Sequence, residues 1–179
     1  MDEPRTAAAA LLIRDARPEE YAEVLAVTRA AYEQYAPAMP ADRWEWYLQN
    51  MAETITQPPA AGAPERIVAE ADGRILGSVL LFPAGSAEGD EPHVRLLAVP
   101  PAGRGRGVGR ALMDDCLRRA RAAGAATLTL HTTTLMGVAK AMYERMGFVR
   151  VPELDFHPEG TPEGGDQVVT VMGYRYRLG

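Results

Sequence analysis

A short segment rich in glycine and arginine, residues 104–109 (Arg-Gly-Arg-Gly-Val-Gly), has the residue types needed to bind an anion. Glycine has no Cβ atom, so such a backbone can turn sharply and bring its N–H groups against a ligand. The first N–H groups of a helix lack intrahelical acceptors and lie at the positive end of its dipole, which stabilises a phosphate. Arg104 and Arg106 add full positive charges. The segment predicts a phosphate-binding loop, with a tight structural turn as the alternative.

The elements on either side of this loop would hold it in place. Residues His93–Val99 are almost all apolar or β-branched, which is typical of a buried strand, and Pro100-Pro101 ends the strand because proline has no N–H for a β-ladder. After the loop, apolar residues recur at helical spacing and predict a helix beginning at or near Gly107. The P-loop pattern does not occur, and the third glycine comes one place too early for a dinucleotide fingerprint.

Two motifs in the chain resemble those of a known family. Arg104, Gly107 and Gly109 match the pattern Arg/Gln-x-x-Gly-x-Gly/Ala, which follows a strand in the GNAT superfamily of acyl-CoA-dependent N-acetyltransferases. The second motif of the superfamily, Ala-x-x-x-Tyr-x-x-x-Gly-Phe, is matched by Ala139, Tyr143, Gly147 and Phe148. With one helix and one strand predicted between the two motifs, the chain resembles this superfamily over at least residues 13–148.

The resemblance implies a fold of the α/β class in which the sheet is mixed, as in α+β proteins. We expect a mostly antiparallel sheet of about six or seven strands, a central parallel pair that splays apart, and about four helices. Residues 1–179 would form a single N-acetyltransferase domain, with residues 1–7 as a flexible N-terminus. The length of 179 residues and the hydrophobic content of 47% suit one domain with a substantial core.

The patterns along the rest of the chain predict its further elements. The dipeptide Asp72-Gly73 tolerates positive φ and predicts a tight hairpin. Two strands of one sheet that are linked through a helix should be parallel, so a ligand belongs at their carboxyl ends. The predicted strands are Ala8–Arg14, Arg66–Ala71, Arg74–Phe82, His93–Val99, Ala126–Thr132, Phe148–Val151 and Gln167–Tyr176. Of the four predicted helices, one starts at Pro18, one starts near Gly107, and the other two span Asp42–Glu53 and Met136–Met146.

Acetyl-CoA is the cosubstrate that the resemblance implies, with no metal. In the superfamily the pantetheine arm bonds main-chain groups of the strand before the loop, and the pyrophosphate lies on backbone N–H groups of the loop. The implied cofactor-binding residues are Leu97, Ala98, Val99, Arg104, Gly105, Arg106, Gly107, Val108, Gly109 and Arg110.

The resemblance also implies direct attack of a primary amine on the thioester. The departing thiolate needs an acid, and in the superfamily this acid is commonly the tyrosine of the second motif, which is Tyr143 here. As an alternative, Tyr143 only orients the sulfur or packs the cleft. Certain members have a glutamate base on the fourth strand, where this chain has His93. An imidazole titrates near neutrality and would serve as a base. His131 and a water chain compete for this role, and either histidine could instead be a hydrogen-bonded residue without a catalytic part.

One contact of the superfamily is not matched. Many members have an asparagine before the last helix that contacts the coenzyme, whereas this chain has Met136. The run Thr132-Thr133-Thr134 could supply hydroxyls instead. The departure leaves open a second interpretation, a non-catalytic acyl-CoA-binding or sensing module of the same fold.

The charge distribution limits the class of partner. The net charge of −5 argues against nucleic acid, since binding a polyanion usually needs a basic surface. Residues 95–121 nevertheless hold seven arginines and two aspartates, a balance of +5, so the remainder carries −10. Positive charge is therefore concentrated beside the predicted phosphate loop, where an anionic ligand would explain Arg104, Arg106 and Arg110. Arg118 and Arg119 are expected to pair with Asp114 and Asp115 at i,i+4.

Other features bear on location and specificity. The apolar run Ala7–Ile13 is too short for a signal peptide or a membrane span, so we expect a cytoplasmic protein with no membrane partner. Cys116 lies on an apolar helix stripe and is predicted to be a core residue. The acceptor would be an amine of a small molecule, peptide or protein, and the superfamily commonly forms homodimers. The choice of acceptor would depend on the first two helices and on loops 57–64 and 152–166. In the second loop, Asp155, Glu159 and Glu163 could attract a cationic amine.

Overall fold

A seven-stranded mixed sheet organises the chain in the order β1-β2-β3-β4-β5-β7-β6. The structure is a computed structural model that describes residues 10–157 and 170–179. Only β4 and β5 pair in parallel, and every other neighbouring pair is antiparallel. The strands are β1 (Leu12–Asp15), β2 (Glu65–Ala71), β3 (Arg74–Phe82), β4 (His93–Ala98), β5 (Thr127–Thr133), β6 (Val149–Arg150) and β7 (Val171–Arg177).

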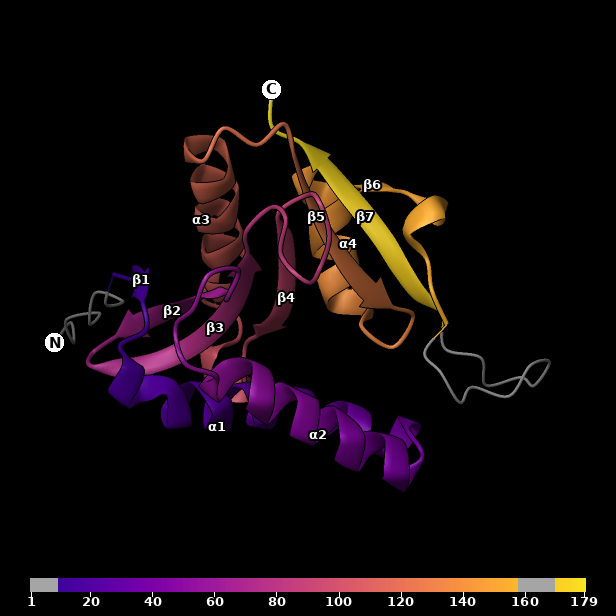
Figure 1. Cartoon of the computed structure of the whole chain (residues 1–179). Helices are drawn as coiled ribbons and strands as arrows, with labels where there is room; N and C mark the ends of the chain where they lie inside the picture. Colours follow the sequence, from indigo (N-terminus) through magenta and orange to yellow (C-terminus); the bar gives the residue numbers. More distant parts are fainter. Residues whose placement is uncertain (1–9, 158–169) are drawn as a thin grey trace, which may run out of the picture.

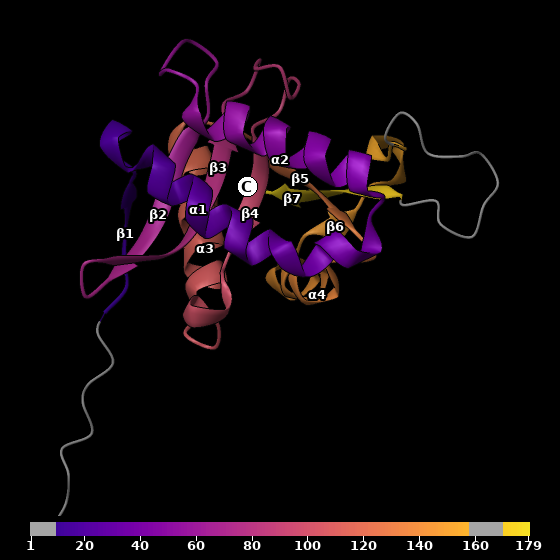
Figure 2. The ribbon, with the colours of Figure 1, turned by 90° about the horizontal axis from the view of Figure 1, so that it is seen from below.

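Helices cover both faces of this sheet. Figures 1 and 2 show α1 and α2 side by side across one face and α3 and α4 on the other. Two apolar cores result, one between the sheet and the first helix pair and one beneath α3 and α4. The α-helices of the described residues are α1 (Tyr21–Tyr32), α2 (Ala41–Thr56), α3 (Val108–Ala122) and α4 (Gly137–Met146).

These elements confirm the predicted mixed sheet with its central parallel pair and four helices. The hairpin at Asp72-Gly73 is confirmed as well, with φ of 51° and 70° at its two residues. The first strand begins later than predicted, at Leu12. Several predictions concern residues that the structure does not describe. These are the flexible residues 1–7, the start of the first predicted strand, Glu159, Glu163, Gln167 and most of loop 152–166.

Helix α2 runs three residues further than predicted because a buried arginine satisfies its carboxyl end. Arg66 of β2 is only 4% exposed, and its guanidinium donates to the carbonyls of Ile55 at 2.6 Å and Gln57 at 2.8 Å. The same group lies 4.4 Å from the centre of the Tyr21 ring. The last carbonyls of a helix have no intrahelical donor, so a donor from the neighbouring strand stabilises the extra turn.

The parallel pair separates soon after it forms. β4 and β5 are paired only at His93–Thr129 and Val94–Leu130. Beyond these pairs, Leu96 adopts a φ of 51°, and β4 has one residue more than β3 between two aligned pairs, which is a β-bulge. The arrowheads of β4 and β5 consequently diverge in Figure 1. The strand stops at Ala98, one residue before the predicted end.

Candidate active site

A cleft of about 650 Å³ lies where β4 and β5 separate. The end of β4, the loop that follows it and the start of α3 form one wall, and α4 with the end of β5 forms another. Tyr32 and Tyr35, near the end of α1, close a third side. Tyr32 is only 6% exposed, so it belongs to the core and also lines the cleft.

The loop between β4 and α3 presents a run of free backbone donors. The N–H groups of Gly103 and Arg104 bond back to the carbonyls of Pro100 and Pro101. Among the described residues, no acceptor is found for the six consecutive N–H groups of residues 105–110, and the first N–H that is bonded again is that of Ala111, to Gly107 at 2.9 Å. Gly107, the residue before α3, has a φ of 74°, which favours glycine. This bend at the positive end of a 15-residue helix fits a diphosphate.

A further glycine of the loop, Gly103, lies in close contact with β3. A Cβ atom on Gly103 would lie 2.2 Å from the carbonyl oxygen of Leu76 in β3. The loop backbone is therefore pressed against β3, which fixes one edge of the cleft. No motif marks this position, because the close approach comes from a strand distant in the sequence.

The arginines near the loop differ in their contacts. Arg104 and Arg110 line the cleft, whereas Arg106 is exposed and does not line it. Arg104 Nε donates to the carbonyl of Val99 at 3.4 Å, which holds the side chain beside the loop. Arg110 pairs with Asp114 at 3.0 Å, an exposed contact of the kind that contributes little to stability.

The predicted pairing on the outer face of α3 is correct in part. Arg119 pairs with Asp115 at i,i+4 as predicted. Arg118 also pairs with Asp115, at i,i+3, so its predicted pairing with Asp114 is wrong. Residues three and four apart are both neighbours on a helix, and Asp114 lies within reach of Arg110 instead.

The three β4 residues predicted to bind the coenzyme lie at the divergence of the strands. Leu97 and Val99 line the cleft, and Ala98 is 1% exposed within the core below α1 and α2. The hydroxyl of Tyr32 donates to the carbonyl of Leu97 at 3.3 Å. Since β5 no longer pairs with β4 at this level, main-chain groups on that side are available to a ligand.

Tyr143 of α4 lines the cleft while being only 5% exposed. Its ring packs edge-on against Phe148, with centroids 5.8 Å apart. Among the described residues its hydroxyl has no hydrogen-bond partner. Burial raises the pKa of this phenol well above its ordinary value, so it stays protonated and can donate.

The two candidate bases are brought together, but in unequal positions. His131 lines the cleft, whereas His93 is 3% exposed and does not line it. His93 Nε2 and His131 Nδ1 are 3.3 Å apart, and His93 Nδ1 is 2.8 Å from the Thr129 hydroxyl. Burial, together with the charges of His131 and Arg95, lowers the pKa of His93 to about 3.

The hydrogen bonds around His131 and His93 involve all of their ring nitrogens. His131 Nε2 lies 2.8 Å from the Leu154 carbonyl, which can only accept, so this nitrogen donates. The other His131 nitrogen faces His93 Nε2, and His93 Nδ1 faces the Thr129 hydroxyl, which donates to the Pro92 carbonyl at 3.2 Å. Every ring nitrogen of the two histidines therefore has a hydrogen-bond partner. The base role predicted for His93 gains no support from this arrangement.

The start of α4 lacks the polar contact that the sequence analysis sought. Met136, the residue before the helix, lines the cleft with its thioether side chain. The hydroxyls of Thr132 and Thr133 are buried without a hydrogen-bond partner among the described residues, and neither residue lines the cleft. The described residues also include no group of three or more His, Cys, Asp or Glu side chains that could hold a metal ion.

Comparison with known families agrees with this geometry. The family model described as the acetyltransferase (GNAT) family matches residues 15–148. The chain belongs to the GNAT acetyltransferase family. GNAT acetyltransferases use acetyl-CoA as the acetyl donor, and the run of free N–H groups at residues 105–110 of this chain suits the phosphates of that molecule.

Relatives and solved structures extend the comparison. The mycothiol acetyltransferase of Nocardia farcinica is 40% identical over 93 residues, which is 52% of this chain and 28% of that protein. The chain therefore spans less than a third of the length of this relative. The PaiA N-acetyltransferase of Thermoplasma acidophilum, solved in complex with coenzyme A, has a TM-score of 0.70 at 16% identity, covering 93% of this chain and 99% of that one. The Salmonella typhimurium protein yncA, solved with acetyl-CoA, has a TM-score of 0.66 at 18% identity over 95% of both chains.

The structure also bears on the predicted burial of Cys116 and on the search for a membrane-spanning helix. Cys116 is fully buried on α3, and burial raises the pKa of its thiol, which confirms a core residue rather than a nucleophile. Among the helices of the described residues, none has both the length and the apolar character needed to cross a membrane.

Proposed function

We propose that this GNAT chain transfers the acetyl group of acetyl-CoA to a primary amine, which attacks the thioester carbonyl directly. One observation supports this above all: the same cleft is lined by the buried Tyr143, with its unbonded hydroxyl, and by the loop whose N–H groups at residues 105–110 lack acceptors among the described residues. Such a cleft can hold the phosphates of coenzyme A at one end and protonate its sulfur at the other.

Each predicted site residue has a role in this proposal. The amides of residues 105–109, with the charges of Arg104 and Arg110, bind the diphosphate, and main-chain groups of residues 97–99 bind the pantetheine arm. The predicted amide of Arg104 takes no part, because it bonds to the Pro101 carbonyl. As the amine nitrogen bonds to the carbonyl carbon and the carbon–sulfur bond breaks, Tyr143 donates its proton to the departing sulfur. The raised pKa of Tyr143 keeps that proton available over the physiological range.

The proton that the substrate ammonium must lose before its nitrogen can attack leaves by a different route. The titratable side chains that line the cleft are tyrosines, arginines and His131, with no carboxylate among the described ones. The imidazole nitrogens of His131 are both hydrogen-bonded, to His93 and to Leu154. We therefore assign proton removal to water in the cleft, with His131 and His93 as residues that hold the cleft wall.

The acceptor is a primary amine of a small molecule, a peptide or a protein. The name of the Nocardia farcinica relative supports acetyl transfer as the reaction class. Because this chain spans 28% of that protein, its acceptor is not carried over.

The test is release of the coenzyme thiol from acetyl-CoA in the presence of a panel of primary amines, with the acetylated product identified by mass spectrometry. Amine-dependent thiol release with stoichiometric N-acetyl product supports the proposal. Binding of coenzyme A without turnover on any amine would instead support the alternative, a non-catalytic acyl-CoA-binding module. Failure to bind coenzyme A would contradict both.

A further inference from the structure

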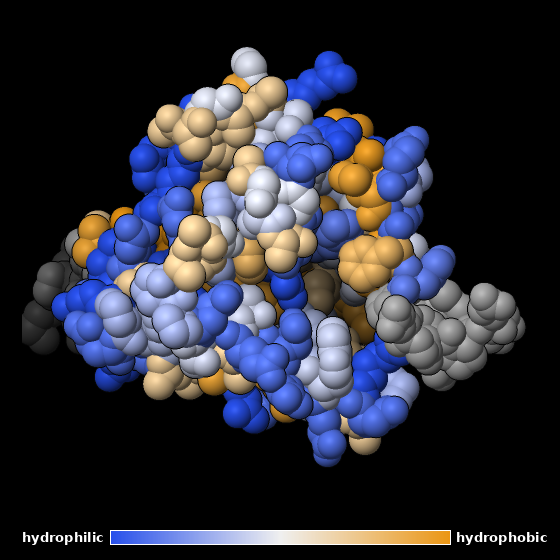
Figure 3. Space-filling view, viewed as in Figure 1, coloured by the Kyte–Doolittle hydropathy of each residue, from blue (hydrophilic) through white to orange (hydrophobic). Residues whose placement is uncertain are grey.

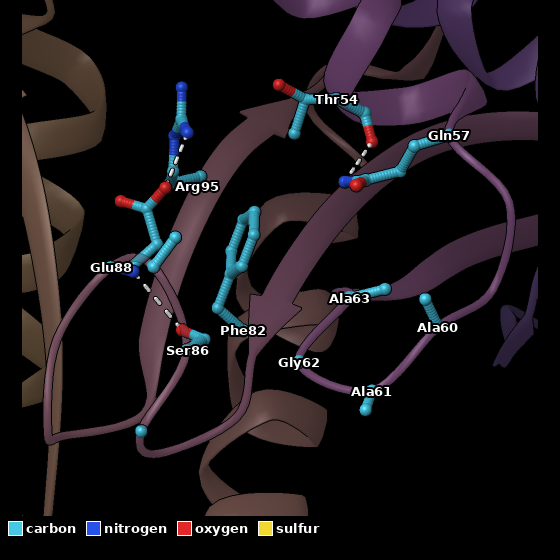
Figure 4. Close-up of a pocket in the computed structure, with 12 residues that line it drawn as sticks. Thr54, Gln57, Ala60, Ala61, Gly62, Ala63, Phe82, Ser86, Glu88 and Arg95 are labelled. Carbon is cyan, nitrogen blue, oxygen red and sulfur yellow. Dashed lines mark hydrogen bonds and ion pairs between the residues drawn. The ribbon is translucent and has the colours of Figure 1, made fainter.

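A second cavity, of about 430 Å³, lies beside the coenzyme cleft and has no part in the chemistry described above. It opens between the end of α2, the segment 60–63, the last residue of β3 and the turn 85–88. Figure 4 shows Phe82 between two groups of side chains, with Arg95 and Glu88 on one side and Gln57 with the segment 60–63 on the other. Its size is within the range of small-molecule sites.

Arg95 connects the two cavities, because it is the residue that lines both of them. Its backbone belongs to β4 directly before Leu96, the residue at the bulge where the strands separate. A molecule with its amine in the cleft and its far end in the second cavity would therefore pass this guanidinium. Its position makes Arg95 a candidate for selecting the acceptor.

The charges in the second cavity cancel. Arg95 Nη1 lies 2.6 Å from Glu88 Oε1, and Arg95 Nη2 donates to Asn50 Oδ1 at 3.0 Å. Arg95 and Glu88 are the charged residues among those that line this cavity. The guanidinium also lies 5.7 Å from the centre of the Phe82 ring. An incoming anion would have to displace Glu88, and an incoming cation would have to displace Arg95.

The hydrogen-bonding capacity of this pair is only partly used. A guanidinium has five N–H donors, of which two are bonded here, and the second carboxylate oxygen of Glu88 has no partner among the described residues. Across the cavity, Gln57 donates to the Thr54 carbonyl. Beside Glu88, the Ser86 hydroxyl accepts from the Glu88 N–H. A neutral group that can both donate and accept would bond to this pair without breaking it, beside the face of Phe82 and the alanines of segment 60–63.

We propose that the second cavity binds the far end of the acceptor, and that Arg95 and Glu88 together select acceptors ending in a neutral hydroxyl or carboxamide. This inference rests on the proposed amine acetylation and adds the class of acceptor. It assigns Arg95 and Glu88 as specificity residues rather than as catalytic residues.

The test uses straight-chain primary amines of equal length that end in hydroxyl, carboxamide, carboxylate, ammonium or methyl. With the wild-type protein, kcat/KM for the hydroxyl and carboxamide amines should exceed the values for the other three by roughly tenfold, since each of the others loses a hydrogen bond or opposes a charge. In Glu88→Gln the carboxylate amine should gain about tenfold relative to the hydroxyl amine, because Arg95 loses its counter-charge. In Arg95→Met the ammonium amine should gain instead.

Asp90→Asn is the matched control, since it removes one negative charge from an exposed residue of the same turn outside the cavity. It should leave the ranking of the five amines unchanged. A wild-type ranking within twofold for all five amines, or the same ranking in Glu88→Gln as in wild type, would overturn the inference.

The same series, titrated calorimetrically into the protein loaded with coenzyme A, separates this inference from the proposed function. Affinities that follow the predicted ranking without any turnover would support the cavity assignment while contradicting acetyl transfer. Turnover of all five amines with equal affinities would do the reverse.

Discussion

The two ends of the parallel strand pair differ in how completely their polar groups are bonded. At the amino end, where β4 and β5 are paired, His93 bonds to Thr129 and His131, and His131 bonds to Leu154. At the carboxyl end the strands have separated, and the N–H groups of residues 105–110 and the hydroxyl of Tyr143 lack partners among the described residues. Both ends therefore contain polar groups that could take part in catalysis, but only the carboxyl end leaves them without partners among the described residues.

In the proposed function, this difference separates the polar groups that hold the fold from those that act on the substrate. A buried polar group without a partner costs free energy, so a fold normally bonds it, as at the amino end. Free donors that line a cleft are available to a ligand, which is what an active site needs. Histidine and tyrosine were both plausible catalytic residues by type, and their bonding state is what distinguishes them here.

Tyr143→Phe should have the largest effect on the carboxyl end. Loss of the proton donor should lower kcat by roughly 10²- to 10⁴-fold, the usual contribution of general acid catalysis, with little change in the affinity for coenzyme A. Steady-state thiol release and calorimetry measure the two quantities. Tyr176→Phe is the control, because this ring also packs on Phe148 but does not line the cleft. Unchanged turnover in Tyr143→Phe would remove Tyr143 as the acid.

His93→Gln tests the amino end through the pH dependence of stability. The pKa of His93 is lowered from 6.5 to about 3, so the unfolded chain binds its proton first and stability is lost as the pH falls below 6.5. At about 1.4 kcal/mol per pH unit, this residue accounts for a loss of about 3 kcal/mol by about pH 4. The free energy of unfolding of His93→Gln should therefore fall less steeply with acid, as measured by urea denaturation.

The control for this experiment is His157→Gln, at an exposed histidine. Its acid slope should match that of the wild type. Parallel curves for wild type and His93→Gln would mean that His93 is not held neutral by burial. A kcat for His93→Gln that falls as far as that of Tyr143→Phe would restore the base role to this residue.

Gly107→Ala tests the bend of the phosphate loop. Gly107 and Gly124, at the two ends of α3, have φ of 74° and 76°, and a Cβ atom at either would meet no other atom within 4 Å. Alanine at either position should cost about 1–2 kcal/mol of stability through backbone strain. Only Gly107→Ala should also weaken coenzyme A binding, by about tenfold, because its Cβ atom stands at the anion site. Equal affinities in the two variants would contradict the loop assignment.

Arg104→Gln should have the smallest effect. Removal of one exposed charge beside the loop should weaken coenzyme A binding by about fivefold, and the loss should shrink as salt is added. Arg118→Gln, on the outer face of α3 and paired with Asp115, should leave the affinity unchanged. Calorimetric titrations at low and high ionic strength compare the two variants. An equal loss in both would indicate a general effect of net charge.

Much of the fold follows from local signals in the sequence. The hairpin at Asp72-Gly73 and the bend at Gly107 both depend on positive φ, which the residue types themselves favour. The start of α3 and the parallel arrangement of β4 and β5 follow from hydrophobic periodicity and from the handedness of strand connections. The extra turn of α2 does not, because it depends on Arg66 from a strand that comes later in the chain.

The candidate site is divided in the same way. The sequence alone predicts the phosphate loop, the coenzyme and Tyr143 of the second motif, since each prediction depends on residue type within a short segment. Only the tertiary structure decided that His131 rather than His93 lines the cleft, and that Arg95 meets Glu88 and Asn50 beside a second cavity. Burial and hydrogen bonding between distant segments depend on strand register and helix packing, which no short stretch of residues encodes.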